Sequence, residues 1–225
     1  SGPRDHRHTR VLMKLFGYFR SSTTYRLRIA LNLKGLPYDY VPVNLIKAEQ
    51  RDEGYVARDP FGSVPLLEAD GRDRAQSMAQ LEWLEEAYPD PPLLPPGIED
   101  RFTVRELAYA IATETHAVNN LPVLTYLKQE FGASQEQIDD WYRHWLARTF
   151  LPVEARLAQH GTGDFLFGAP GLFEVVLLPQ LYNARRFALD LAPYPHMARI
   201  EAACLALDAF QRAHPDNQID NPERS

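Results

Sequence analysis

The stretch RSSTTYRLRIALNLKG, residues Arg20 to Gly35, decides the fold. Its apolar residues Leu27, Ala30 and Leu31 share one face at helical spacing, which predicts a helix with Gly35 just past its end. Four consecutive hydroxyl residues, Ser21 to Thr24, stand where this helix begins. A helix start needs a single capping hydroxyl. The other three are more than capping requires, so the start of this helix is a candidate site.

The neighbouring segments have the pattern of short strands and one further helix. The predicted strands are rich in β-branched and aromatic residues: MKLFGYF at 13–19, YDYVPVNL at 38–45, and two in GSVPLLEADGRDRAQ at 62–76. Asp70-Gly71 is the predicted turn between the last two. In the helix predicted at 77–88, Ser77 and Gln80 have the spacing of a capping box. The order is β-α-β, a connecting segment, then β-β-α.

The second half of the chain is helical in pattern. It follows YPDPPLLPPG, residues 88–97, where five prolines in ten residues exclude a helix or a central strand. The predicted helices are 102–119, 121–131, 134–161, 172–189 and 195–214. The fourth contains the run VVLL, apolar on all sides, and should be central and buried. We therefore expect a thioredoxin-like α/β domain at 13–91, a linker at 92–97 and an all-helical bundle at 98–225.

Composition excludes several classes of partner. The chain has 225 residues, 45% of them hydrophobic, and a net charge of −6 without any Lys/Arg run, so neither nucleic acid nor an anionic membrane is expected. No apolar run approaches the ~20 residues of a membrane span. The single cysteine, Cys204, excludes an internal disulfide and a zinc cluster, and no metal is expected. We expect a cytoplasmic protein whose native start is Met13, after a leader at 1–12.

These motifs together resemble the zeta class of the glutathione transferase family, which includes maleylacetoacetate and maleylpyruvate isomerases. The resemblance runs from Met13 to about Asp220. It rests on five separated segments: residues 20–35, VPLL at 64–67, QSMAQLEWLEE at 76–86, LLPQLYNARRF at 177–187 and FQRAHPDNQIDNP at 210–222. It implies the glutathione transferase fold, glutathione as cofactor and a homodimer.

Three departures from the family pattern stand out. Thr23 replaces the family's usual Cys and so removes a thiol from beside the reaction centre. The family's helix-opening T-x-A-D is GLFE here, with Glu174 as the only candidate to cap at Gly171. We expect this change to weaken the local helix by ~1 kcal/mol without touching the chemistry. The family's Asn-Pro before the V-P motif is Asp59-Pro60.

The resemblance implies that Ser21 stabilises the thiolate of glutathione, with Ser22 and Thr23 beside it. A free thiol has a pKa of about 8.5, and lowering it by ~2 units needs about 2.7 kcal/mol of preferential interaction with the anion. A hydrogen bond to a charged group supplies roughly 1.5 to 3 kcal/mol and a helix N-terminus about 0.3 to 1. One hydroxyl with the helix N-terminus is therefore enough. The alternative is that any one of these hydroxyls only caps the helix.

Other contacts to glutathione are implied by the same resemblance. Val64 and Pro65 match a motif whose backbone pairs with the cysteinyl part and whose proline is cis, although a proline there would equally suit an edge strand. Gln76 and Ser77 match the pair that holds the γ-glutamyl carboxylate, and a helix N-terminus favours a carboxylate. Three polar residues resemble those that face the site from the helical half, and by pattern alone they would be turn residues: His116, Asn119 and Asn120.

The implied substrate is a small dianion, which calls for arginine because a guanidinium binds a carboxylate through two hydrogen bonds. Arg20 and Arg186 match the family's arginines. Arg185 points about 100° away from Arg186 on a helix, so at most one of the two faces the pocket. Arg26 and Arg28 lie a turn inside the first helix and are expected to be structural.

The leading hypothesis is a glutathione-dependent cis-trans isomerase of aromatic catabolism. Thr23 favours maleylpyruvate as substrate, whereas Leu121-Pro122 stands where that branch can carry arginine, and we lean towards maleylacetoacetate. A transferase or dehalogenase acting on α-haloacids is an alternative, since the same thiolate would serve it. Another is a binding module without catalysis, against which the intact Ser21, Gln76 and Ser77 argue.

Overall fold

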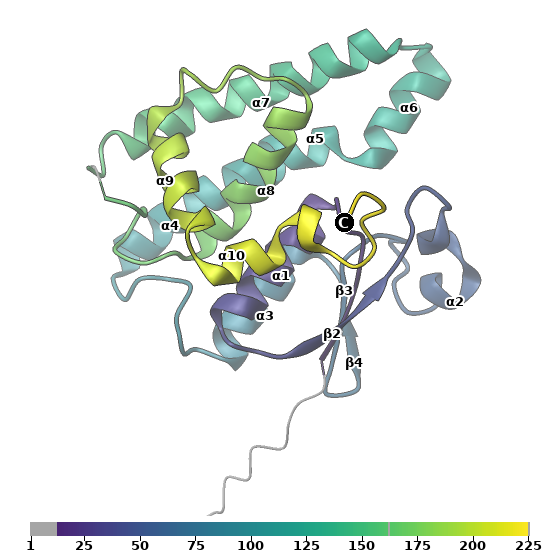
Figure 1. The fold of residues 1–225 in the computed structure, drawn as a ribbon, viewed down its shortest axis with the longest axis horizontal. Coiled ribbons are helices and arrows are strands. Elements are labelled where there is room, and N and C mark those ends of the chain that lie inside the picture. The colour runs from purple at the N-terminus through teal and green to yellow at the C-terminus, as the bar shows by residue number, and fades with distance from the viewer. Residues whose placement is uncertain (1–12, 162, 225) are drawn as a thin grey trace, which may run out of the picture.

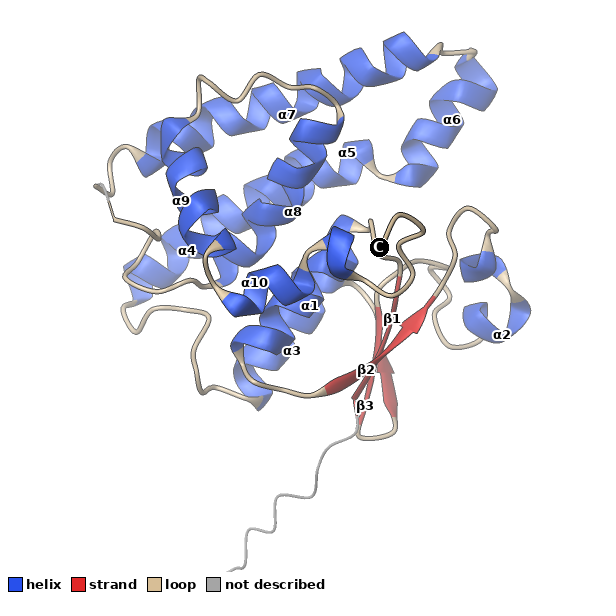
Figure 2. Ribbon diagram, viewed as in Figure 1, coloured by secondary structure: helices blue, strands red, loops and turns tan. Residues whose placement is uncertain are grey.

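The computed structural model describes residues 13–161 and 163–224, and the predicted leader lies outside them. A small sheet domain is followed by a larger helical one (Figures 1 and 2). The sheet domain contains β1 (Met13–Gly17), α1 (Ser22–Leu33), β2 (Tyr38–Pro42), η1 (Glu49–Arg51), α2 (Glu53–Val56), β3 (Leu66–Ala69), β4 (Arg72–Arg74) and α3 (Ser77–Ala87). The helical domain contains α4 (Ile98–Ala110), η2 (Ile111–His116), α5 (Ala117–Asn119), α6 (Leu121–Phe131), α7 (Gln135–Leu157), α8 (Leu172–Arg186), α9 (Pro195–Leu205), α10 (Asp208–Ala213) and η3 (Pro215–Asn217).

The four strands form one mixed sheet in the order β2-β1-β3-β4. β1 and β2 are parallel, as expected for strands joined through a helix, and the other two pairs are antiparallel. Asp70 and Gly71 both have positive φ, 53° and 69°, which a tight hairpin turn requires. The predicted β-α-β and β-β-α order is therefore confirmed. β1 ends at Gly17 rather than at residue 19, because a turn from Tyr18 to Ser21 follows it.

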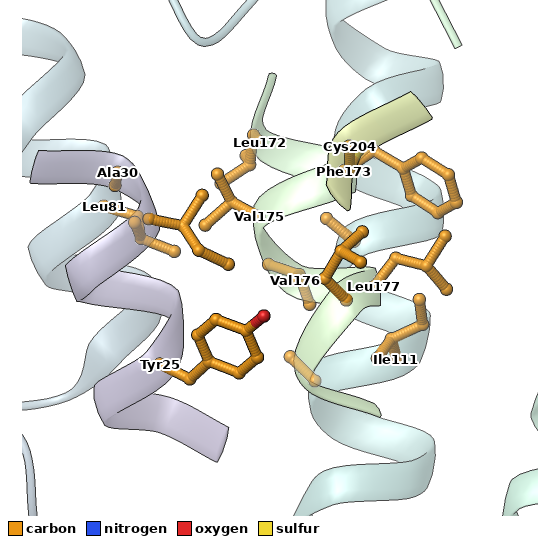
Figure 3. Packing of buried hydrophobic residues seen from close by; sticks show 14 of the residues in the cluster. Tyr25, Ala30, Leu81, Ile111, Leu172, Phe173, Val175, Val176, Leu177 and Cys204 are labelled. Atoms are coloured by element: carbon orange, nitrogen blue, oxygen red, sulfur yellow. The ribbon is translucent and has the colours of Figure 1, made fainter. Parts of the chain in front are cut away.

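A continuous apolar core joins the two domains, with α1 and α8 packed against each other inside it. Figure 3 shows Tyr25 of α1 pointing towards α8, the helix that carries Val175 and Val176. The predicted central helix is confirmed, since Val175 and Val176 are fully buried. Cys204 is also buried, and burial raises the pKa of its thiol. Within the described residues no helix combines the length and apolarity needed to cross a bilayer.

Two helix predictions in the second half have different outcomes. The helix predicted from residue 134 is confirmed as α7, and it begins with a capping box: the Ser134 hydroxyl accepts from the Gln137 N–H at 3.2 Å, and the Gln137 side chain accepts from the Ser134 N–H at 2.8 Å. The single helix predicted at 195–214 is wrong, because it breaks into α9 and α10 at Leu207, whose backbone is extended. The break turns α10 against α1 and buries Phe210.

The proline-rich segment between α3 and α4 contains neither helix nor strand. It is fixed by Lys34, whose ammonium donates to Glu85 and to the carbonyls of Tyr88 and Pro91 at 2.7 to 2.9 Å. Glu85 also accepts from the N–H of Leu93 at 2.8 Å. The segment therefore lies against the sheet domain, and the division of the chain at 92–97 stays a prediction.

Candidate active site

The turn from Tyr18 to Ser21 leads from β1 into α1. The Ser21 N–H donates to the Tyr18 carbonyl at 3.0 Å, and the Ser21 hydroxyl oxygen caps α1 by accepting from the Thr24 N–H at 3.2 Å. This hydroxyl lies at the N-terminal end of a 12-residue helix, where the helix dipole favours an anion. A hydroxyl that accepts from the backbone still has its own proton to donate. The capping role and the predicted donor role of Ser21 are therefore compatible.

Thr23 joins the Ser21 hydroxyl to a distant loop. Its Oγ1 donates to the Val64 carbonyl at 2.8 Å and lies 3.0 Å from Ser21 Oγ. Because the carbonyl takes the Thr23 proton, Ser21 is the donor between the two hydroxyls. The peptide bond between Val64 and Pro65 is cis, as the resemblance implies. The Val64 N–H has no partner among the described residues and can pair with the backbone of a bound peptide.

Asp59, one of the departures from the family pattern, shapes the loop that leads to Val64. It is fully buried, and its carboxylate accepts from the Phe61 N–H at 3.0 Å and from both the N–H and the hydroxyl of Ser63 at 3.2 Å. A carboxylate oxygen accepts more than one hydrogen bond, so Asp at this position holds three donors.

Ser22 faces the helical domain rather than the Val64 loop. Its Oγ accepts from Asn183 Nδ2 at 2.9 Å, and Asn183 Oδ1 accepts from Arg186 Nη1 at 3.2 Å. Asn183 therefore connects Ser22 with Arg186, two residues predicted separately. Asn183 is not among the site residues predicted from the sequence. The available signal was its position three residues before Arg186, on the same face of a helix.

Two arginines flank these hydroxyls: Arg20 precedes Ser21, and Arg186 is linked to Ser22 through Asn183. Burial lowers the pKa of Arg186, and the charge of Arg20 lowers it further. Neither forms an ion pair with a described residue. Arg185 instead pairs with Glu201 of α9, which confirms that the adjacent arginines face different directions. Two cations at one site without carboxylate partners among the described residues suit a dianionic ligand.

α3 begins at Ser77, one residue earlier than a capping box with Ser77 as the N-cap predicts. Gln76 is the N-cap residue, with a φ of 68° that is uncommon outside glycine, and no side chain caps the helix. The Gln80 side chain donates to the carbonyls of Pro65 and Arg74 at 3.0 and 2.6 Å. The predicted capping box is wrong, because Gln80 holds the segments on either side of the site. The first N–H groups of α3 are left for a carboxylate, together with the Ser77 hydroxyl.

This arrangement fits glutathione, a thiol tripeptide with a carboxylate at each end. The start of α3 suits the γ-glutamyl carboxylate, and the free Val64 N–H suits the cysteinyl backbone. Ser21 at the start of α1 suits the sulfur. The chain therefore has a donor for each of these three parts of the tripeptide.

Comparison with known proteins agrees with this geometry. A profile of the family Glutathione S-transferase, N-terminal domain, matches residues 11–86. The maleylpyruvate isomerase of a Ralstonia species is 44% identical over 93% of this chain and 100% of its own length. The solved holo structure of maleyl pyruvate isomerase, a bacterial zeta-class glutathione S-transferase, aligns with a TM-score of 0.91 at 43% identity, covering 92% of this chain and 99% of that one. The chain belongs to the zeta class of the glutathione transferase family.

A second solved relative has ligands in its active site. It is the maleylacetoacetate isomerase of Anaeromyxobacter dehalogenans 2CP-1, with dicarboxyethyl glutathione and citrate in its active site. It is 44% identical, has a TM-score of 0.83, and covers 94% of this chain and 98% of its own. The predicted family and the predicted glutathione transferase fold are both confirmed.

The helical half of this zeta-class protein contributes three predicted residues, which occupy different places. Asn120 caps α6, since its side chain accepts from the Val123 N–H at 3.2 Å, which is the turn role. Asn119 is buried, and its side-chain amide has no partner among the described residues. His116 is neutral, because burial and the nearby charge of Arg26 lower its pKa to about 3. Contact of these three residues with glutathione stays a prediction.

Proposed function

We propose that this zeta-class protein is a glutathione-dependent isomerase that converts a cis enol dicarboxylate, maleylacetoacetate or maleylpyruvate, into its trans form. When bound, glutathione supplies a thiolate that adds to the activated double bond, so that the bond rotates before the thiol leaves. The observation that carries the proposal is that Arg20 and Arg186, which have no carboxylate partner among the described residues, flank the hydroxyls of Ser21 and Ser22.

The hydroxyl residues have separate roles in this proposal. When glutathione binds, the Ser21 proton turns from Thr23 Oγ1 to the sulfur anion, while the Ser21 oxygen still accepts from the Thr24 N–H. Thr23 fixes the Val64 loop against α1, and Ser22 fixes Asn183 and through it Arg186. Only Ser21 is then a direct thiolate donor, and the other two position its surroundings.

The two arginines bind the carboxylates of the substrate. The thioether held by the Anaeromyxobacter relative carries two carboxylates on its added group, which supports a dianion beside the sulfur. Arg20 precedes Ser21 directly, so a carboxylate held there lies next to the reacting sulfur. Maleylacetoacetate remains our preferred substrate, with maleylpyruvate as the other candidate.

We also infer that residues 13–91 bind glutathione, that residues 98–225 hold the substrate, and that the protein is a cytoplasmic homodimer. Large exposed apolar side chains support an interface between copies: Phe61, Ile98 and Phe102 are 65%, 79% and 61% exposed. Analytical ultracentrifugation tests the homodimer. Replacing Phe61 with Ser is expected to shift the protein towards monomer.

The decisive experiment is an absorbance assay of both maleyl substrates, with and without glutathione, on the unmodified protein and three variants. Ser21→Ala is expected to bind glutathione but to lose turnover, because the thiolate loses its donor. Arg186→Ala is expected mainly to raise KM, since it removes a carboxylate partner. Arg185→Ala is the matched control, because its guanidinium faces Glu201 instead.

Two outcomes would overturn this function. One is unchanged rates in both Ser21→Ala and Arg186→Ala. The other is a protein that turns over α-haloacids while leaving both maleyl substrates untouched, which would make it a dehalogenase.

A further inference from the structure

The turn that contains Arg20 and Ser21 is held by a hydrogen bond to Asp220, near the other end of the chain. The N–H of Phe19 donates to Asp220 Oδ2 at 2.8 Å, across 201 residues of sequence. Phe19 immediately precedes Arg20, so this bond fixes the backbone from which both site side chains project. The predicted site contained Arg20 and Ser21 but no residue that holds their turn.

A second charged residue fixes the other side of the same turn. Arg28 Nη2 donates to the Phe19 carbonyl at 2.9 Å, and Arg28 Nε donates to the Ala213 carbonyl at 2.8 Å. Arg28 is fully buried, and burial lowers its pKa while the charge of Asp220 acts in the opposite direction. An anion therefore holds the N–H of Phe19, and a buried cation holds its carbonyl.

The carboxylate of Asp220 is itself kept in place. Its Oδ2 also accepts from the Tyr40 hydroxyl of β2 at 3.1 Å. The preceding tail is anchored by Gln218, whose side chain donates to the carbonyls of Arg212 and His214 at 2.8 and 2.9 Å. Figure 1 shows the C-terminal segment returning from the helical domain to lie beside β1 and α1. The bond to Phe19 therefore joins two segments that are each fixed independently.

We propose that Asp220 is a positioning residue for the reaction, acting through the Phe19 backbone to place the Ser21 hydroxyl and the Arg20 guanidinium. This inference rests on the proposed function of that site. A misplacement of about 1 Å can cost on the order of 100-fold in rate. Among the described residues, Asp220 forms its hydrogen bonds with Phe19 and Tyr40, and none with α3 or the Val64 loop, the elements proposed to hold the γ-glutamyl carboxylate and the cysteinyl backbone. Replacing Asp220 should therefore slow the reaction without weakening the binding of glutathione.

The test compares Asp220→Ala, which removes both hydrogen bonds, with Tyr40→Phe, which leaves the bond to Phe19. Asp216→Ala is the control, because Asp216 lies in the same tail and its exposed side chain lies 3.5 Å from His214 rather than at the Phe19 turn. Three quantities are measured: the pKa of bound glutathione from thiolate absorbance, the affinity for S-methylglutathione, and kcat and KM for isomerisation. S-methylglutathione has no thiol, so its affinity reports on binding alone.

For Asp220→Ala we expect the thiol pKa to rise towards the free value of about 8.5 and kcat/KM to fall about tenfold or more. The affinity for S-methylglutathione should stay within about twofold, and Tyr40→Phe should fall between Asp220→Ala and the unmodified protein. A lower melting temperature with an unchanged thiol pKa and unchanged kcat/KM would show a merely structural role and overturn the inference. The thiol pKa needs no maleyl substrate, so it tests Asp220 even if isomerisation itself fails.

Discussion

The guanidinium of Arg26 donates to the hydroxyl oxygen of Ser77 at 3.1 Å and so connects α1 to the first residue of α3. Arg26 is 1% exposed, forms no ion pair with a described residue, and has two further nitrogens without partners there. Burial lowers its pKa to about 10, which leaves it a cation at neutral pH. Since arginine only donates, the Ser77 proton is left for a ligand, and the buried cation favours a carboxylate beside it.

Replacing Arg26 with Met is therefore expected to weaken glutathione binding by about tenfold, which corresponds to about 1.4 kcal/mol. Calorimetry should compare glutathione with an analogue that lacks the γ-glutamyl α-carboxylate. If Arg26 acts on that carboxylate, the analogue will bind the unmodified protein and Arg26→Met equally well. Equal losses for both ligands would contradict this role, and circular dichroism would show whether the variant is folded.

His116 should make stability depend on pH. Its pKa is about 3 in the folded protein, against an ordinary value of 6.5. Between these values the unfolded chain binds a proton that the folded chain does not, so stability is complete above about pH 6.5 and falls with acidification by about 1.4 kcal/mol per pH unit. Urea unfolding from pH 4.5 to 7.5 measures this slope.

His116→Gln should reduce the slope between pH 4.5 and 6.5. It will not abolish the slope, because burial also lowers the pKa of His214. His160→Gln is the control, since His160 is exposed. An identical slope in His116→Gln and in the unmodified protein would show that His116 is protonated in the folded state.

Thr23 should matter through its link to Val64. Thr23→Val keeps the shape of the side chain but removes the hydroxyl that holds the Val64 carbonyl at 2.8 Å. Loss of one hydrogen bond is worth about 1 kcal/mol, so we expect roughly fivefold weaker glutathione binding in calorimetry. Thr23→Ser retains the hydroxyl and should bind as tightly as the unmodified protein. Equal affinities for all three proteins would mean that the Val64 loop holds its position without this bond.

The four hydroxyls at the start of α1 illustrate what the sequence can predict. Their number and their place before a helix identified the site, because a cap needs only one of them. Their separate roles depend on partners brought in by the fold: the carbonyl of Val64 lies 41 residues from Thr23, and Asn183 lies 161 residues from Ser22. Local spacing contains no information about such partners. The order of strands and helices could be predicted because hydrophobic periodicity and turn residues are local signals that do not depend on distant partners.

The same limit explains the wrong capping box at Ser77. Spacing alone matched the motif, but the Gln80 amide is bonded to the carbonyls of Pro65 and Arg74. Those carbonyls reach Gln80 only when the cis Val64-Pro65 loop and β4 are both in place. A motif of four residues cannot show competition from residues outside it.

The N-cap residue of α8 is Gly171, where the family usually has threonine. Replacing Gly171 with threonine should destabilise the protein. A Cβ added at Gly171 would lie 2.5 Å from the Leu93 carbonyl oxygen, which also accepts from the Leu172 N–H at 2.8 Å. Glu174 already accepts from the Gly171 N–H at 2.8 Å, so the helix start has its cap. Gly171→Thr is therefore expected to destabilise the protein by about 1 to 3 kcal/mol. It should not restore the ~1 kcal/mol of helix stability that the change from T-x-A-D to GLFE was predicted to remove.

Urea unfolding of Gly171→Thr measures that cost, and Gly54→Ala is the matched control because a Cβ at Gly54 meets nothing within 4 Å. The control should unfold at the same urea concentration as the unmodified protein or slightly above it, since alanine limits the unfolded chain more than glycine does. Gly171 lies against Leu93 rather than beside the Ser21 hydroxyl, so isomerase activity below the unfolding transition should not change. A more stable Gly171→Thr would mean that the linker moves away from α8 at no cost, in contradiction to the close approach of Leu93.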